Sequence, residues 1–253
     1  SRGMTIFHKD GTEVFESAVS FEHAIDQMGH YPDKRSDSKG VEPEGMEFAV
    51  FGDTPYVFVM AERSSIVGVF DVSDLADAKL KQLLPSGISP EGAVAIPARG
   101  LLATANEYDG LEDGAARAHV MLYQYSEAPA IFPQITSAGT DELIGFGAIS
   151  GMVAGEGSTI YAVNDSFYGY QPTIFTIDAS TFPVKVTAVT RVTRVGYPAQ
   201  KLDMEGIALD GEGGFWVASE GRTDRMVPHV LYHIAADGTI RDEISLPDEL
   251  LAV

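Results

Sequence analysis

A two-residue motif, an acidic residue or serine followed by glycine, recurs along the chain and constrains its fold more than any other feature. Its copies are Glu44-Gly45, Glu91-Gly92, Ser150-Gly151 and Glu205-Gly206. They lie roughly 50 residues apart, which is close to the length of a four-stranded propeller blade with the surplus residues in loops. The repeat therefore predicts an all-β fold, a β-propeller with four-stranded blades.

Each motif is followed by the same series of apolar segments, in which a second strand ends in a polar pair and a third strand follows. The third strands are rich in the β-branched and aromatic residues that favour strands. The predicted second strands are residues 56–61, 101–105, 159–163 and 214–218, and the third strands are 66–72, 119–125, 173–177 and 229–234. A fourth strand is clearest at 184–192 and 239–246. A pair of β-sandwiches is the runner-up fold, but it gives no reason for a polar pair at one fixed place in each repeat.

The repeats predict one β-propeller over residues 1–253, and its expected parts follow in chain order. They are a half blade at 1–17, a linker with a short helix at 18–43, and blades at 44–85, 90–136, 149–193 and 204–247. The longest helical candidates are residues 21–28 and 75–84. The opening half blade finds no inner strands at the C-terminus, and open rings leave exposed edges. We therefore expect about four and a half blades of a larger ring, with the remaining blades of the parent protein outside this sequence.

Acidic residues outnumber basic residues by 37 to 17, which gives a formal net charge of −20. Nucleic-acid affinity depends on Lys and Arg, so we expect no nucleic-acid partner. The chain has no cysteine, which excludes disulfides and zinc–thiolate sites. No apolar stretch reaches the length that spans a bilayer, so we expect no membrane insertion in this segment. The excess carboxylate suits solubility in salt or the capture of hard cations such as Ca²⁺.

Carboxylates recur where each innermost strand begins and where each second strand ends. These two strands form an antiparallel hairpin, so the two positions share one end of the blade, at one mouth of the central channel. The predicted metal ligands at this mouth are Glu44, Glu91, Glu205, Asp165, Asn106, Asn164 and Glu107. Their oxygen atoms predict a divalent cation, with Ca²⁺ as the expected ion. The alternative is that the carboxylates accept backbone N–H bonds and form salt bridges with neighbouring arginines.

Four charged residues beside the predicted metal ligands are candidates for catalysis: Arg63, Arg222, Glu62 and Glu220. The forked donors of arginine suit phosphate and carboxylate, as would the nearby Arg35 and Lys39. A metal-activated water with one such arginine would suffice to hydrolyse a phosphoester or another ester of a small-molecule substrate. Loops 108–118 and 166–172 join second to third strands on the same face, so we expect them to carry specificity.

Two family resemblances rest on short stretches of the sequence. RSDSKGVEPEG (35–45), AER (61–63), VFDV (69–72), SPEG (89–92) and ANE (105–107) resemble the bacterial choice-of-anchor I propeller family. ISG (149–151), YAVNDS (161–166), MEGIA (204–208) and WVASEG (216–221) resemble the family called esterase-like activity of phytase. Both resemblances imply an exported bacterial propeller, in a secreted, periplasmic or cell-surface location.

Two functions from different classes fit these observations. One is a secreted, metal-dependent hydrolase, phytase-like or esterase-like, that acts at the acidic channel mouth. The other is a non-catalytic cell-surface propeller that binds a partner, with a structural calcium ion in its ring. A catalytic ion would be open to substrate, whereas a structural ion would be buried and fully ligated.

Overall fold

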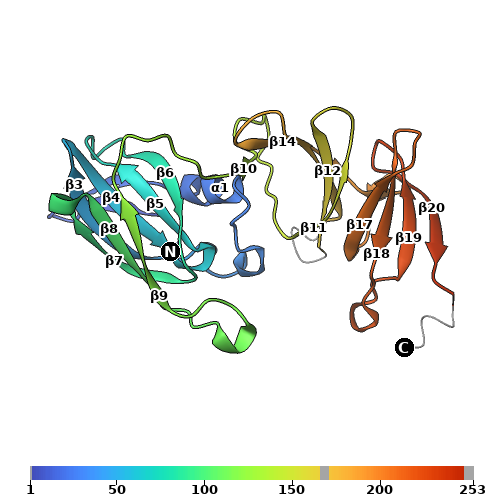
Figure 1. Cartoon of the computed structure of the whole chain (residues 1–253), viewed down its shortest axis with the longest axis horizontal. Coiled ribbons are helices and arrows are strands. Elements are labelled where there is room, and N and C mark those ends of the chain that lie inside the picture. The colour runs from blue at the N-terminus through green and yellow to red at the C-terminus, as the bar shows by residue number, and fades with distance from the viewer. Residues whose placement is uncertain (1, 166–170, 248–253) are drawn as a thin grey trace. The chain divides into compact units, whose positions relative to one another are not determined.

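The structure, a computed structural model, describes residues 2–165 and 171–247 and divides into two compact units, Ser1–Pro133 and Gln134–Val253 (Figure 1). Nearly all of the regular structure is β, arranged as antiparallel meanders in which each strand pairs with the next along the chain. The predicted fold class, an all-β protein of propeller type, is confirmed. Within the described part of the chain, no helix is long and apolar enough to cross a membrane.

The first unit contains a hairpin, one short helix and two larger sheets. The hairpin pairs β1 (Thr5–Phe7) with β2 (Glu13–Glu16), and α1 (Ser20–Asp26) is the helix. One sheet has the order β3 (Pro43–Phe51), β4 (Thr54–Ala61), β5 (Ile66–Asp71), β6 (Lys79–Pro85). The other has the order β7 (Pro90–Ile96), β8 (Leu101–Asn106), β9 (His119–Gln124). Single 3-10 turns are η1 (Asp33–Arg35), η2 (Glu62–Ser64), η3 (Pro97–Arg99) and η4 (Leu111–Asp113).

The second unit contains two larger sheets and a two-stranded one. The first has the order β10 (Ile135–Thr136), β14 (Val184–Arg191), β13 (Thr173–Asp178), β12 (Thr159–Asn164), β11 (Ile149–Ala154). The second has the order β17 (Met204–Leu209), β18 (Phe215–Ser219), β19 (Val230–Ile234), β20 (Ile240–Ser245). β15 (Thr193–Arg194) pairs with β16 (Tyr197–Pro198), and η5 (Thr223–Arg225) is a 3-10 turn.

Apolar side chains bury one sheet face against the next within each unit. In the first unit, Phe58 and Met60 of β4 pack in one buried cluster with Leu102 of β8. The other face of the same sheet packs against α1, where the Phe21 ring occupies the space that a side chain at Gly68 would need. In the second unit, a core that includes Val217 and Tyr232 joins the two larger sheets. The alternation of strand residues thus supplies a core on both faces of an inner blade.

Two local expectations are corrected by the structure. Residues 75–84 are not helical, because 79–85 form β6 and pair along the full length of β5. The sheet of the expected blade at 90–136 has three strands rather than four, because β10, at the end of this range, belongs to another sheet. Its expected fourth strand is replaced by an irregular stretch after β9, and β10 pairs in parallel with β14. The helix expected within 18–43 is present as α1.

Candidate functional site

The repeated motif is a β-bulge in each of the four innermost strands. The pairing register shifts between Pro43 and Gly45, and likewise between the residues that flank the motif in the other three copies. The bulged residues are Glu44, Glu91, Ser150 and Glu205. A bulge turns its extra residue away from the regular alternation of the strand. The motif therefore presents one polar side chain at the start of every innermost strand.

The glycine of the motif permits a close approach of the next innermost strand. A Cβ atom built on Gly45 would lie 2.0 Å from the carbonyl oxygen of Glu91. A Cβ atom on Gly151 would lie 3.0 Å from the carbonyl oxygen of Glu205. In both units, the bulge of one blade is thus fixed directly against the glycine of the blade before it, which brings the carboxylates of two blades together.

One backbone hydrogen bond recurs beside each bulge. The N–H of the acidic residue that follows each second strand donates to the carbonyl two residues before the bulge. The pairs are Glu62 to Glu42 (3.1 Å), Glu107 to Ser89 (3.0 Å), Asp165 to Ala148 (2.8 Å) and Glu220 to Asp203 (2.8 Å). Three of these acceptor residues have left-handed backbone conformations, with φ of 52° at Glu42, 54° at Ser89 and 47° at Ala148. The repeat thus fixes both acidic positions of each hairpin at the same end of the blade.

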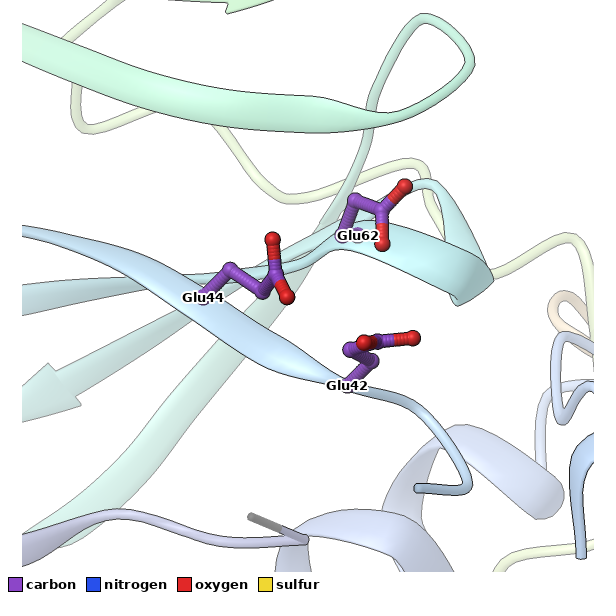
Figure 2. Close-up of side chains that lie close together, drawn as sticks. All are labelled: Glu42, Glu44 and Glu62. Carbon is purple, nitrogen blue, oxygen red and sulfur yellow. The ribbon is translucent and has the colours of Figure 1, made fainter. Parts of the chain in front are cut away.

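The first carboxylate cluster consists of Glu42, Glu44 and Glu62, which lie side by side in Figure 2. Glu42 is 3% exposed and receives three cations. Arg35 Nη2 lies 2.5 Å and Arg63 Nε 3.2 Å from its Oε2, and Lys39 pairs with its Oε1. The hydrogen bond from Lys39, with the help of the two arginines, lowers the pKa of Glu42 to about 2 although burial opposes it. Glu42 is therefore already neutralised by the protein.

The second cluster shares Glu62 with the first and adds Glu91 and Glu107 from the next sheet. One carboxylate oxygen from each residue lies within 4.8 Å of the others. Glu62 is 1% exposed, and neither of its oxygens accepts a hydrogen bond of ordinary geometry among the described residues. Among the described residues, its ion pair joins Oε1 to Arg63 Nη1 at 2.8 Å. A buried carboxylate with an unpaired oxygen thus faces two further carboxylates.

The electrostatics of this second cluster differ from those at Glu42. Burial raises the pKa of Glu62, and the Ser89 side chain and the Arg63 guanidinium oppose that rise only in part. Burial also raises the pKa of Glu91, and the neighbouring carboxylates, with Glu107 foremost, raise it further. Groups whose charged forms are disfavoured in this way recruit either a proton or a cation.

Asn106 and Asn164 lie at the ends of β8 and β12, as expected, and both are 3% exposed. The Asn106 Oδ1 accepts a hydrogen bond from Ser86 Oγ at 2.6 Å, and its amide group donates to the His119 carbonyl at 3.1 Å. The Asn164 amide group donates to the Asp165 carbonyl at 3.3 Å. These bonds hold the strand ends in place, and the role of both asparagines as ion ligands stays a prediction.

The second unit contains a third cluster, formed by Asp165, Asp203 and Glu205, again with one oxygen of each within 4.8 Å of the others. Burial raises the pKa of Glu205, with further contributions from Asp165, Asp203 and Glu220. Asp203 is 4% exposed and was not among the predicted ligands. The backbone bond from Glu220 places it at the position that Glu42 has in the first unit, so an alignment of the repeats could have found it.

Cations also lie near the third cluster. Burial lowers the pKa of Lys201, as does Arg225, whereas Asp203 and Asp165 oppose the shift. The predicted Arg222 forms a bidentate pair with Asp224, with Nε–Oδ1 and Nη2–Oδ2 distances of 3.2 and 3.1 Å. Arg222 thus presents its fork to a carboxylate of its own turn, and Arg63 to Glu42 and Glu62. Salt bridges of this kind are what the alternative interpretation of the sequence expected.

The predicted carboxylates are divided between the two units. The first unit holds Glu44, Glu62, Glu91 and Glu107, and the second holds Asp165, Glu205 and Glu220. Each set is brought together around a bulge, and the convergence of all seven on one mouth stays a prediction. Of the two expected specificity loops, residues 108–118 fold back on themselves through bonds such as Gly110 N–H to the Ala116 carbonyl at 2.9 Å. Most of the loop at 166–172 lies outside the described residues.

Comparison with known proteins matches the two ends of the chain to different families. Residues 144–253 match the family model described as esterase-like activity of phytase. Residues 1–75 match the family model described as the choice-of-anchor I domain. Both resemblances predicted from the sequence are thereby confirmed. The second half of the chain is thus similar to phytase-like proteins and its start to a choice-of-anchor domain, and no curated protein sequence matches it significantly.

Solved structures are similar to the chain only at low identity. Hydrazine synthase from Kuenenia stuttgartiensis is 13% identical with a TM-score of 0.29, and the match covers 81% of this chain and 49% of that one. A functionally unknown protein from Desulfotomaculum acetoxidans is 11% identical with a TM-score of 0.33, and the match covers 96% and 64% of the two chains. The chain thus spans about half to two thirds of these structures.

Proposed function

We propose that this chain is a phytase-like hydrolase that binds a divalent cation, with Ca²⁺ as the expected ion, and cleaves a phosphoester or another ester beside it. The observation that carries the proposal is Glu62, a carboxylate that is 1% exposed and has an oxygen without a partner among the described residues. Glu91 and Glu107 lie within reach of the same ion.

The charge balance of this cluster favours a bound cation. Unit charges of like sign 4 to 5 Å apart repel by roughly 3 to 4 kcal/mol at an effective dielectric constant of about 20. Three carboxylates meet here, and among the described residues their ion pair is with Arg63, which is shared with Glu42. A divalent cation would offset the excess negative charge and satisfy the free oxygen of Glu62.

The donor set fits a hard cation. All of the donor atoms are carboxylate oxygens, the ligands that Ca²⁺ prefers, and three carboxylates can fill up to six of its six to eight positions. Glu107 is exposed and Glu91 is half-buried, so one side of the cluster is open to solvent. An open side leaves coordination positions for water or substrate, as a catalytic site requires.

The chemistry proposed here divides between the ion and the protein. A bound divalent cation polarises a phosphoryl or carbonyl oxygen and lowers the pKa of water. Glu62, Glu91 and Glu107 would position the ion, and Arg63, whose side chain is 43% exposed, would orient an anionic substrate group with its outward donors. In the second unit, Asp165, Asp203 and Glu205 would hold an ion in the same way, beside Arg222 and Glu220.

A second function is favoured by the contacts of Arg63. This arginine already bonds to Glu42 and Glu62, and a guanidinium engaged in that way can act as a fixed counter-charge. The second proposal is a non-catalytic cell-surface protein in which the ion stabilises the packing of neighbouring blades. Both proposals place the protein outside the cytoplasm, in keeping with the choice-of-anchor and phytase-like matches.

Hydrolysis assays with ion binding measured in parallel test the two proposals. We would assay p-nitrophenyl phosphate, p-nitrophenyl acetate and phytate with Ca²⁺ or with chelator, using wild type, Glu91→Gln and the control Glu13→Gln, which alters an exposed strand residue. We expect Ca²⁺-dependent turnover that is lost in Glu91→Gln and kept in the control. Ca²⁺ binding without turnover would favour the structural ion, and the absence of Ca²⁺ binding would contradict both.

A further inference from the structure

The outer edge of β9 is an unpaired sheet edge at a position that a fourth strand fills in the other blades. β5 pairs with β6, β13 with β14, and β19 with β20, each antiparallel along most of its length. β9 is the third strand of its sheet, and the sheet ends with it. The residues that follow β9 are described as far as 165, and they form no strand beside it.

The register of β9 identifies which backbone groups face this edge. Tyr125 N–H donates to the Gly100 carbonyl at 2.8 Å, and the register pairs Tyr123 with Leu102 and Met121 with Thr104. Residues with the parity of Tyr125 therefore bond to β8, because antiparallel pairs alternate between bonded and non-bonded. The N–H and C=O groups of Val120, Leu122 and Gln124 consequently point to the open edge.

A groove of about 600 Å³ runs beside this edge within the first unit. Its walls include Phe51, Phe58, Leu84, Tyr123 and Tyr125, and the segment 126–132 lines its far side. Tyr123 of β9 lines the groove, so alternate side chains of a strand paired with β9 would lie on the same side of the sheet as the groove. The β9 edge thus offers free backbone groups for a fourth strand to pair with and a groove for its side chains.

Lys81 and Glu127 are the charged residues that line the groove, and the chain segments that flank β9 add further charges, which favour a basic strand. Acidic residues outside the carboxylate clusters dominate the segments on either side of β9: Asp109, Glu112, Asp113 and Glu127. The basic residue of that stretch, Arg117, pairs with Asp109 at 2.8 Å. A chain with a net charge of −20 repels acidic peptides and attracts basic ones.

We propose that the β9 edge binds an extended, basic peptide segment of a partner protein by strand addition. Main-chain hydrogen bonds to residues 120, 122 and 124 would supply affinity, and an apolar side chain in the groove would supply specificity. This interaction surface is separate from the carboxylate clusters and does not depend on the proposed hydrolytic function.

Fluorescence anisotropy with a labelled peptide KVTVTVTVK tests the proposal on the full chain. We expect saturable binding that is absent for KVTPPPTVK, whose prolines interrupt both alternating sets of backbone N–H groups, and weaker for EVTVTVTVE at low salt. Leu122→Pro removes one outward N–H and keeps the bonds to β8, so affinity should fall about tenfold, the equivalent of one hydrogen bond. Leu122→Thr keeps the N–H and should bind as wild type does. If Leu122→Pro does not fold, Gln124→Pro makes the same test at the strand end.

Amide hydrogen exchange provides a second readout. The amides of residues 120, 122 and 124 should exchange rapidly in the free protein and slowly with peptide bound. Protection in the free protein that grows with concentration would mean that a second copy covers the edge. Protection independent of concentration would mean that residues 126–134 cover it. Either result would overturn the proposal, as would equal binding of all three peptides, or of wild type and both proline variants.

Discussion

Glu42 and Glu62 are joined by a backbone hydrogen bond and are both nearly inaccessible to solvent, yet their surroundings have opposite effects on their charge. Arg35, Lys39 and Arg63 converge on Glu42 and lower its pKa to about 2. Burial raises the pKa of Glu62, which has a single cation at one oxygen and carboxylates nearby. Glu42 and Glu62 differ in the number of cations that contact them, although both are buried and both lie among carboxylates. The number of counter-charges therefore distinguishes a closed salt-bridge cluster from a candidate cation site.

The largest effect is expected for Gly45→Ala, which would push the backbone at Glu91, a neighbour of Glu62 in the second cluster, away from β3. Its Cβ would lie 2.0 Å from the Glu91 carbonyl oxygen, whereas a Cβ on Gly92 would have no atom within 4 Å. We expect Gly45→Ala to lower the free energy of unfolding by about 3 kcal/mol. Gly92→Ala is the matched control, with a change within about 0.5 kcal/mol. Urea denaturation measures both, and equal losses would contradict the close approach of the two strands.

A smaller loss is expected for Glu42→Gln, which removes the shared acceptor of three cations. Charge-assisted hydrogen bonds contribute about 1.5 to 3 kcal/mol each, and the partial exposure of the three cations reduces the net effect to about 2 kcal/mol. In the presence of chelator, Glu62→Gln should be neutral or stabilising, because it removes a carboxylate from a repulsive cluster. Thermal melting measures both variants, with Glu13→Gln as control. If Glu42→Gln and Glu62→Gln were destabilised to a similar extent, the proposed difference between Glu42 and Glu62 would be contradicted.

The smallest effect is a pH dependence of opposite sign at the two residues. The folded pKa of Glu42 is about 2, below its ordinary value of 4.5, so its contribution is present above pH 4.5 and is lost as the pH falls towards 2. The folded pKa of Glu62 is raised above 4.5, so in chelator the protein should lose stability as the pH rises through that raised value. Comparing the stability of Glu62→Gln with that of wild type between pH 4 and 8 isolates the contribution of Glu62. If the stability of wild type and of Glu62→Gln changed with pH in the same way, the raised pKa of Glu62 would be refuted.

Much of the fold could be predicted from the sequence because the repeat acts locally. All four copies of the motif form a bulge at the start of a strand, and Gly45 and Gly151 are in addition required by the close approach of the next strand. Residues 75–84 were misassigned because this stretch has no Gly or Pro and is rich in Leu, Ala and Lys, which form helices readily. Pairing with β5 makes these residues a strand rather than a helix, and that pairing cannot be read from the local sequence.

The candidate site was only partly predictable. The positions of Glu62, Glu91 and Glu107 follow from the hairpin geometry of the repeat, and the structure brings them together. The cations of Glu42 come from a segment outside the repeat, as Arg35 and Lys39 show, so the neutralisation of this carboxylate could not be inferred from spacing. Asp203 was missed because two of its three counterparts, Ser89 and Ala148, are not acidic, and only Glu42 shares its charge.

Calorimetric titration of Ca²⁺ into wild type, Glu62→Gln and Glu13→Gln tests the central claim most directly. The account predicts that wild type and Glu13→Gln bind the ion alike and that Glu62→Gln binds one ion fewer per chain. At about 100 times its dissociation constant, an ion that binds only the folded state adds about 2.7 kcal/mol to stability, and Glu62→Gln should lose that increment. Identical isotherms for wild type and Glu62→Gln, or no Ca²⁺ binding by the wild type, would contradict the account.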